Sequence, residues 1–194
     1  MKLPCLFAAL VLLAGLVPIA AAEPASPTLR SVTDLSGKSV DPFGKGDARA
    51  TLFVFLRTDC PVSNSYAPTI RRLHAKFAPQ GVALSLVFLD RDQTPEILKS
   101  HITEFDLPGT VLCDYQHALA QRCGIRVTPE AAVFSRDRKL TYAGRIDDRY
   151  RALGKPQPEA QLRELEEAVI ATLAGKPVSP ARGAAVGCPI SDLR

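Results

Sequence analysis

The segment from Thr51 to Leu73 constrains the fold most, because its periodicity changes at a cysteine. Leu52 to Leu56 form a short apolar run, partly β-branched or aromatic, and this composition predicts a buried strand. The next apolar residues recur every three or four positions, which predicts a helix with one buried face: Val62, Tyr66, Ile70, Leu73 and Phe77. Cys60 therefore lies where a strand ends and a helix begins.

This position favours a reactive thiol at Cys60. Unpaired backbone N–H groups and the helix dipole favour negative charge there, and the thiolate is the form that attacks. Pro61 fits the first helical turn, because its missing N–H would have had no partner. Arg57 favours the thiolate and Asp59 opposes it. The alternative, a small core cysteine, is disfavoured because Cys60 lies outside the apolar stripe.

Two motifs together resemble the thioredoxin-like superfamily. The first is a strand, then Cys60-Pro61-Val62-Ser63, then a helix interrupted by Pro68. The second is the segment GIRVTPE at 124–130, followed by a strand at 131–135. The resemblance runs from about Leu29 to Ala174 and is closest to the redoxin and AhpC/TSA branch and to the periplasmic thioredoxins of cytochrome maturation. It implies a cis peptide bond before Pro129, opposite Cys60, and a substrate-binding role for Pro61, Thr128 and Pro129.

Strands and helices alternate along the rest of the chain. This order predicts an α/β thioredoxin-like fold, in which helices flank a mixed central sheet and a β-hairpin precedes it. Further strands are expected at 82–89, 110–113, 131–134 and 140–143, and the N-terminal hairpin at 29–40. Further helices are expected from Pro95 (capped by Thr94), over 115–123 (capped by Asp114) and over 158–173.

The sequence predicts four segments. Residues 1–22 have a lysine, a long apolar run and the small residues Ala20-Ala21-Ala22, which are typical of a cleaved signal peptide. A short lead-in at 23–28 precedes the thioredoxin-like domain at 29–175. Residues 176–194 form a Pro/Gly/Ala-rich tail with a cysteine, expected to be flexible. We therefore expect an exported protein, periplasmic or secreted, that does not span a membrane after cleavage.

The charge distribution argues against nucleic-acid binding. The formal net charge is only +4, and the basic residues are scattered rather than gathered in one patch. Outside the signal peptide there are four cysteines, Cys60, Cys113, Cys123 and Cys188, and their spacing alone does not choose among three complete pairings. Cys113 falls in a strand pattern and Cys123 follows a helical one, so both are assigned to the core.

A second thiol is needed to release the mixed disulfide that a nucleophilic cysteine forms. Ser63 occupies the usual position, three residues after Cys60, and a hydroxyl does not do this. The protein then uses an external thiol or a distant cysteine. Cys188 is the best distant candidate, because a mobile tail could bring it to Cys60; the alternative is a spare thiol, or one that pairs with another molecule.

These features predict an exported thiol–disulfide oxidoreductase that uses Cys60, with no cofactor and no metal. Its partners would be a thiol or disulfide protein, or a small-molecule thiol or peroxide, with an external reductant. A peroxiredoxin-like peroxidase is the first alternative, although Arg57 and Phe53 stand where that family has Thr or Ser and Pro. A partner-binding or Sco-type copper-handling domain is the second, although the motif has one cysteine and the three histidines fall in predicted helices.

Four further side chains receive structural roles. Glu130 follows the second motif, and Asp147 and Asp148 lie in the segment GRIDDRY. All three carboxylates are interpreted as solvated surface charges, although they could accept protons. Tyr66 is interpreted as a core packing residue.

Overall fold

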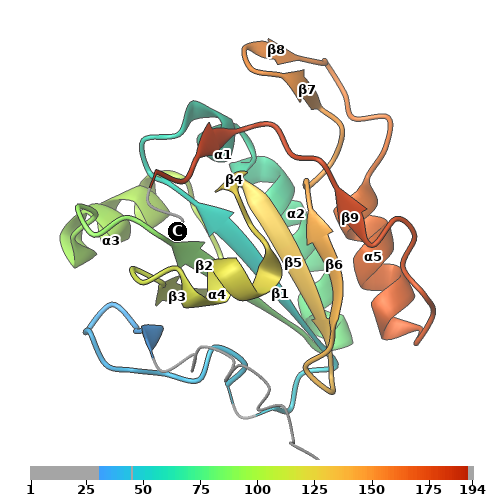
Figure 1. Ribbon diagram of the computed structural model, residues 1–194, viewed down its shortest axis with the longest axis horizontal. Helices are drawn as coiled ribbons and strands as arrows, with labels where there is room; N and C mark the ends of the chain where they lie inside the picture. The colour runs from blue at the N-terminus through green and yellow to red at the C-terminus, as the bar shows by residue number, and fades with distance from the viewer. Residues whose placement is uncertain (1–30, 45, 192–194) are drawn as a thin grey trace, which may run out of the picture.

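The computed structural model describes residues 31–44 and 46–191, so the predicted signal peptide and lead-in lie outside the described residues. Its centre is a six-stranded sheet with the order β3-β2-β1-β5-β6-β9 (Figure 1). β1, β2 and β3 are mutually parallel, whereas β5 runs antiparallel to both β1 and β6. The strands span Ala50–Leu56 (β1), Val82–Phe88 (β2), Thr110–Cys113 (β3), Glu130–Ser135 (β5), Leu140–Gly144 (β6) and Arg182–Gly183 (β9).

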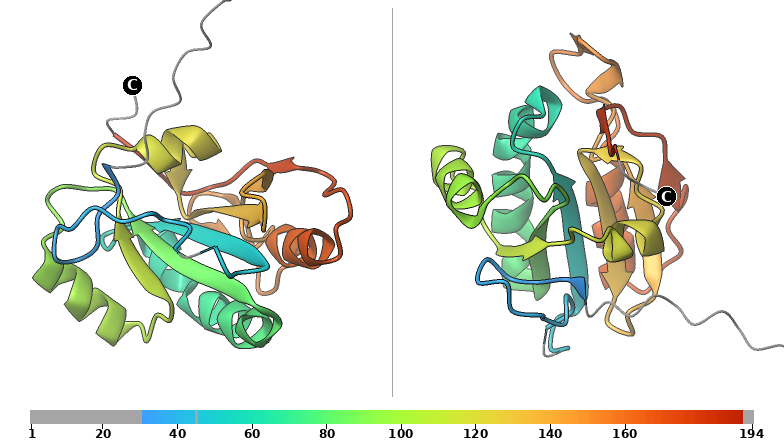
Figure 2. Two further views of the ribbon diagram at one scale, coloured as in Figure 1. Left: turned by 90° about the horizontal axis from the view of Figure 1, so that it is seen from below. Right: turned by 60° about the vertical axis from the view of Figure 1, so that its left-hand side comes forward.

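The central strand β1 is buried along its whole length, as its apolar run predicts. Its side chains alternate between two core clusters, one on each face of the sheet. The first cluster holds residues of α2 (Ala67–Phe77), α3 (Pro95–Glu104) and α5 (Glu164–Leu173). The second holds residues of α4 (Ala118–Cys123) and of the N-terminal segment. The left view of Figure 2 shows these two layers, and the mixed sheet between helices confirms the predicted fold.

The helix after Cys60 is divided in two. α1 spans Pro61–Ser65, and α2 begins at Ala67 with Pro68 in its first turn. The division follows from Pro68, which has no N–H to continue the hydrogen bonding of α1. The predicted apolar stripe is buried, because Ile70, Leu73 and Phe77 of α2 all lie in the first core cluster.

Two predicted helices begin later than expected. α4 begins at Ala118 and not at Tyr115, because Asp114 Oδ2 accepts the N–H of Ala120, six residues ahead. α5 begins at Glu164 and not at Pro158, because the chain before it wraps around a carboxylate: Asp148 Oδ1 accepts the N–H groups of Gln161 and Leu162. Elsewhere the helix prediction is confirmed, as at α3, where Thr94 Oγ1 caps the N–H of Ile97.

Two short hairpins lie outside the six-stranded sheet. The N-terminal one is smaller than predicted, since within the described residues it is a single antiparallel bridge between Thr33 and Ser39. A hairpin that the sequence did not suggest, β7 (Tyr150–Ala152) with β8 (Lys155–Pro156), projects beyond the sheet (Figure 1). None of the helices described between residues 31 and 191 has the length and apolar character that a membrane span needs.

The tail after α5 follows a defined path, unlike the patternless segment that its composition predicts. It adds β9 to the edge of the sheet beside β6, and then β10 (Cys188–Pro189) pairs with β4 (Val127–Thr128). Ile190 then enters the second core cluster, and its N–H donates to the carbonyl of Arg126. Main-chain pairing of this kind needs no side-chain periodicity, so composition gave no sign of it. Figure 1 shows the tail crossing from α5 to the region of α1 and β4.

Candidate active site

Cys60 lies at the N-cap of α1, directly after the turn that follows β1. Its side chain is only 1% exposed. Sγ accepts the backbone N–H of Ser63 at 3.5 Å, and the thiol form donates to the carbonyl of Thr128 at 3.3 Å. The sulfur is therefore held between the start of α1 and the segment that precedes Pro129, while Pro61 is exposed at the first position of the helix.

The Thr128-Pro129 peptide bond is cis, as the resemblance predicted, and its carbonyl faces Cys60. Glu130 holds this loop in place. Its Oε2 accepts the N–H groups of Arg126 at 2.7 Å and Val127 at 3.1 Å, and the side chain is buried. The interpretation of Glu130 as a surface charge is therefore wrong. Burial raises the pKa of its carboxyl, and the two N–H donors oppose that effect.

Cys188 lies beside Cys60, because β10 pairs with β4 in a register that sets Cys188 opposite Thr128. The approach is close at Gly187, where an added Cβ would lie 2.1 Å from the carbonyl oxygen of Thr128. The side chain and the backbone N–H of Cys188 both hydrogen-bond to the Cys60 sulfur. Both cysteines are free thiols in this structure.

The two thiols have opposite acidities. Burial raises the pKa of Cys60, but the hydrogen bonds from Cys188 and Ser63 outweigh it, and the pKa falls below its usual value. Burial, the hydrogen bond to Cys60 and the charge of that thiolate raise the pKa of Cys188 to about 12. Cys60 is therefore the more acidic thiol of the pair, and Cys188 is the thiol that holds its proton more tightly.

Arg57 pairs with Asp59, the carboxylate next to Cys60 in the sequence. Its guanidinium makes two hydrogen bonds of 3.0 Å to the Asp59 carboxylate and approaches Asp90 at 2.9 Å. The hydrogen bonds to Arg57 lower the pKa of Asp59, so that carboxylate stays ionised and paired. Arg57 also interacts electrostatically with Cys188 and lowers its pKa, against the larger effect of burial.

A second polar cluster lies at the junction of α1 and α2. The hydroxyl of Tyr66 donates to Asp147 Oδ1 at 2.6 Å, and the same oxygen accepts the N–H of Arg149 at 3.0 Å. Tyr66 is a core residue, as predicted, but Asp147 and Asp148 are buried, so their interpretation as surface charges is wrong. Asp147 binds Tyr66 at the junction of α1 and α2, whereas Asp148 caps the segment before α5.

The structure thus brings together five of the residues that sequence analysis singled out: Cys60, Pro61, Thr128, Pro129 and Cys188. Cys113 and Cys123 are buried in the core, as expected, and burial raises the pKa of each thiol, that of Cys123 to about 12. Sequence reasoning missed Gly187 and the role of Glu130. A glycine directly before Cys188-Pro189 was the available sign of a close backbone approach.

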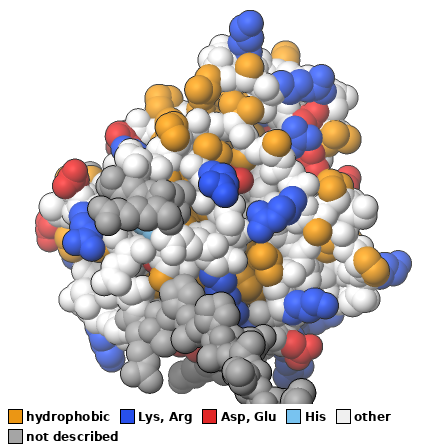
Figure 3. All heavy atoms as spheres, viewed as in Figure 1, with side chains coloured by type: hydrophobic (Ala, Val, Ile, Leu, Met, Phe, Trp, Pro, Cys, Tyr) orange, Lys and Arg blue, Asp and Glu red, His pale blue; other side chains and the backbone are white. Residues whose placement is uncertain are grey.

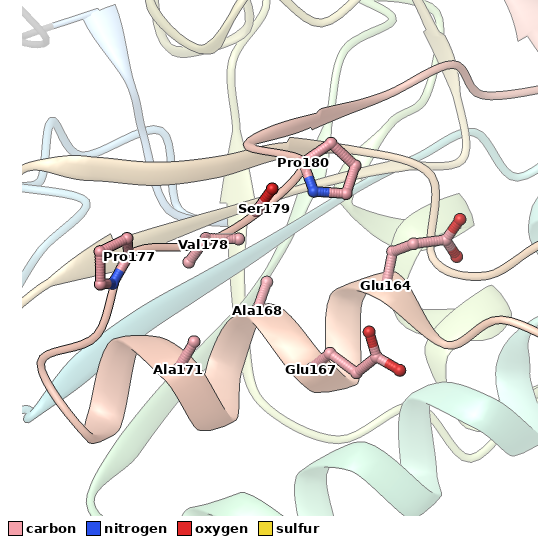
Figure 4. Close-up of a pocket in the computed structure, with 8 residues that line it drawn as sticks. All are labelled: Glu164, Glu167, Ala168, Ala171, Pro177, Val178, Ser179 and Pro180. Atoms are coloured by element: carbon pink, nitrogen blue, oxygen red, sulfur yellow. The ribbon is translucent and has the colours of Figure 1, made fainter.

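The surface around the site is mixed. Figure 3 shows apolar side chains gathered over the upper part of this face, where α1 and β10 lie in Figure 1, with Lys and Arg side chains among them. A separate cavity of about 180 Å³ lies between α5 and the tail (Figure 4) and contains no thiol. It is lined by Glu164, Glu167, Ala168, Ala171, Pro177, Val178, Ser179 and Pro180.

The fold and the site, a cysteine at a strand-to-helix junction facing a cis-proline, define a thioredoxin-like protein. The family model Redoxin matches residues 20–161, most of the chain. The chain therefore belongs to the Redoxin family.

Among curated proteins, the chain is similar to the thiol-disulfide oxidoreductase ResA of Bacillus thuringiensis subsp. konkukian. The two are 28% identical over 112 residues, which is 56% of this chain and 61% of the relative, less than two thirds of its length. ResA of Bacillus cereus matches to the same extent.

Two solved structures share the fold. The hypothetical protein SMc02350 of Sinorhizobium meliloti 1021 superposes with a TM-score of 0.70 and 25% identity, over 82% of this chain and 88% of that one. A secreted disulfide oxidoreductase of Mycobacterium tuberculosis, homologous to E. coli DsbE, has a TM-score of 0.51 and 21% identity, over 72% of this chain and 93% of that one. At this identity the second similarity speaks for the fold alone.

Proposed function

We propose that this protein is an exported thiol–disulfide oxidoreductase in which Cys60 is the nucleophile and Cys188 the resolving cysteine. The observation that carries the proposal is the hydrogen-bonded pair of free thiols, one with a lowered and one with a raised pKa. Membership of the Redoxin family and similarity to ResA support the class of reaction.

The reaction begins when the Cys60 thiolate attacks a disulfide R–S–S–R′. A bond forms between Cys60 Sγ and one substrate sulfur, and the second substrate sulfur leaves as a thiolate that takes the Cys188 proton. The Cys188 thiolate then attacks Cys60 Sγ and releases the first substrate sulfur. The substrate gains two electrons from the protein. The protein is left oxidised, with a Cys60–Cys188 disulfide, until an external thiol reduces it to the dithiol.

The pairing of the two thiols sets the order of these steps. While Cys60 is a thiolate, its charge and its hydrogen bond keep the proton on Cys188. Once Cys60 is in a mixed disulfide its charge is gone, so that contribution to the pKa of Cys188 disappears and Cys188 deprotonates more easily. Resolution therefore follows the first attack and does not precede it.

Substrate would reach Cys60 at the edge formed by Pro61, Thr128 and Pro129. In this structure β10 is paired with the backbone at Thr128. A polypeptide substrate that pairs at this edge must therefore displace part of the tail. We propose the same four segments as the sequence predicts: a signal peptide at 1–22, a lead-in at 23–28, the domain at 29–175 and a tail at 176–194 that moves during turnover. The proposed place outside the cytoplasm rests on the signal-peptide pattern of residues 1–22.

A thiol peroxidase is the second candidate function, favoured by the burial of Cys60. A sulfur that is 1% exposed beneath a docked tail is reached more easily by a small hydroperoxide than by a polypeptide disulfide. The Cys60 thiolate would attack the peroxide oxygen, release an alcohol or water and become a sulfenic acid. Attack by Cys188 would then release water and form the same Cys60–Cys188 disulfide.

The experiment compares turnover of glutathione disulfide, and separately of hydrogen peroxide, by purified wild-type protein and three variants, with dithiothreitol as reductant. Cys60→Ser is expected to abolish turnover, and Cys188→Ser to accumulate a mixed disulfide at Cys60. Cys113→Ser is the control and is expected to keep the wild-type rate. If Cys60→Ser turns over either oxidant at the wild-type rate, the proposal is refuted. The oxidant that the wild-type protein turns over faster decides between the two candidate functions.

A further inference from the structure

We propose that the thiol that reduces the Cys60–Cys188 disulfide attacks the sulfur of Cys188, so that the tail cysteine is where electrons enter the protein. This inference rests on the proposed function, because it concerns the same pair of thiols. It assigns to Cys188 a role beyond resolution: Cys188 is the sulfur that meets the external reductant.

The unequal exposure of the two sulfurs carries the argument. Cys60 belongs to the first core cluster together with Val62 and Tyr66, and Cys188 is only partly buried against that cluster. A thiolate attacks in line with the S–S bond, from the far side of the sulfur that it strikes. The residue Cys60 is 1% exposed, so its sulfur offers an external thiolate the smaller opening. Cys188, on β10, is partly exposed, so its sulfur is the more open of the two to an external thiolate.

The contacts of Cys60 also make it the better leaving group. The Ser63 N–H and the backbone N–H of Cys188 both hydrogen-bond to its sulfur, and they remain available when the S–S bond breaks. The thiol with the lower pKa leaves faster, and that thiol is Cys60. Exposure and acidity therefore select the same direction of cleavage.

Charge near Cys188 favours an incoming thiolate. The partly buried guanidinium of Arg57 acts on Cys188 electrostatically, while Asp59 and Asp90, which also carry negative charge there, are paired with Arg57. An approaching thiolate thus meets a cation beside the sulfur that it attacks. No displacement of β10 from β4 is needed, because Cys188 is partly exposed while the two strands are paired.

The electrons balance over two steps. A thiolate RS⁻ bonds to Cys188 Sγ, the S–S bond breaks, and Cys60 leaves as the thiolate. A second RS⁻ then attacks the sulfur of R, forms R–S–S–R and releases Cys188, which takes a proton. The reductant loses two electrons and the dithiol is restored.

The test traps the first of these steps. The protein is oxidised with diamide, the intramolecular disulfide form is isolated, and it is mixed rapidly with limiting glutathione. The mixture is quenched in acid, alkylated with N-ethylmaleimide and mapped by peptide mass spectrometry. We expect glutathione on Cys188 and N-ethylmaleimide on Cys60, in at least about tenfold excess over the reverse arrangement.

Two other results are informative. If glutathione is found on Cys60 as often as on Cys188, or more often, this inference is overturned and the proposed function stands. If diamide gives no Cys60–Cys188 disulfide at all, the proposed function fails and this inference fails with it. As a matched control, Gly187→Ala is oxidised in the same way. Because it displaces β10 from Thr128, its proportion of glutathione on Cys60 is expected to rise.

Discussion

Cys60 and Cys188 have the same chemical group and differ through their neighbours. Cys60 accepts hydrogen bonds from Ser63 and Cys188, whereas Cys188 is partly buried beside Cys60, and the charge of Arg57 lowers its pKa only in part. The acidity of Cys60 thus depends on a residue 128 positions away in the sequence. This dependence gives the first prediction.

Replacing Cys188 with alanine removes a hydrogen-bond donor, so the pKa of Cys60 should rise. Thiolate absorbance near 240 nm, followed against pH, measures that pKa. Cys188→Ser is the matched control: its hydroxyl can still donate, so its pKa is expected between those of the wild type and Cys188→Ala. An unchanged titration in Cys188→Ala would contradict the pairing of the two thiols.

The hydroxyl of Tyr66 supports the turn between α1 and α2 by donating to buried Asp147. Tyr66→Phe should lower the free energy of unfolding by about 1–3 kcal/mol, because a buried carboxylate loses a donor. Tyr150→Phe, which loses a hydrogen bond to Ser65 in a less buried place, is the control and should cost about 0.5–1.5 kcal/mol. Urea denaturation measures both, and equal costs would argue against a special role for the Tyr66–Asp147 contact.

At the scale of single residues, the sequence predicted the functional residues that stand in a recognisable local pattern. The periodicity of apolar residues changes at Cys60, and Thr128-Pro129 lies in a segment that resembles a motif of the thioredoxin-like superfamily. Glu130, Asp147 and Asp148 were misjudged because a carboxylate looks the same in a sequence whether its partners are water molecules or N–H and O–H groups of the protein. Each is buried by contacts that only the folded chain creates.

At the scale of helices and strands, the sequence did not predict where α4 and α5 begin. Both helices begin late because the side chains of Asp114 and Asp148 accept backbone N–H groups well ahead of them in the chain. Apolar spacing predicted that these helices exist, and long-range capping decided where they begin.

Asp114, before α4, should make stability depend on pH. Burial raises the pKa of its carboxyl to about 6, against backbone hydrogen bonds that lower it. The folded protein then holds the proton more tightly than the unfolded chain, so the free energy of unfolding falls as pH rises from about 4 to about 6. The loss is about 1.4 kcal/mol for each unit by which the pKa is raised.

Asp114→Asn removes this titration but keeps an acceptor for the N–H of Ala120. Its stability should therefore change less between pH 4 and pH 7 than that of the wild type. Thermal denaturation at a series of pH values measures the difference. Parallel curves for the two proteins would show that Asp114 is ionised at its ordinary pKa.

The two-residue strands of the tail depend on backbone approach and not on side-chain packing. Gly187 is the tightest point, because a Cβ there would overlap the Thr128 carbonyl. Gly187→Ala should slow formation of the Cys60–Cys188 disulfide by at least about tenfold, since β10 no longer fits against β4. The rate is followed by gel shift after stopped oxidation with diamide.

Ala184→Ser is the matched control for this prediction. Ala184 lies in the same tail and is exposed, so the substitution should leave the rate of disulfide formation unchanged. Equal rates for Gly187→Ala and the wild type would mean that β10 does not position Cys188.

At the scale of the whole molecule, the fold followed from the alternation of strands and helices and from the buried run of β1. The assembly of the site did not. Residues 60, 128 and 188 meet because the sheet sets β1 beside β5, and because the tail crosses the sheet edge through β9 before it reaches β4. Sequence reasoning suggested Cys188 as a partner for Cys60 but treated its arrival as the chance motion of a loose tail.

The central claim is that Cys60 and Cys188 form one redox pair. The measurement that tests it most directly is mass spectrometric mapping of every cysteine after mild oxidation of the purified protein. The structure predicts one intramolecular disulfide, between Cys60 and Cys188, with Cys113 and Cys123 as free thiols in the core. A Cys113–Cys123 disulfide, or Cys60 found only as an adduct with small thiols while Cys188 stays reduced, would contradict it.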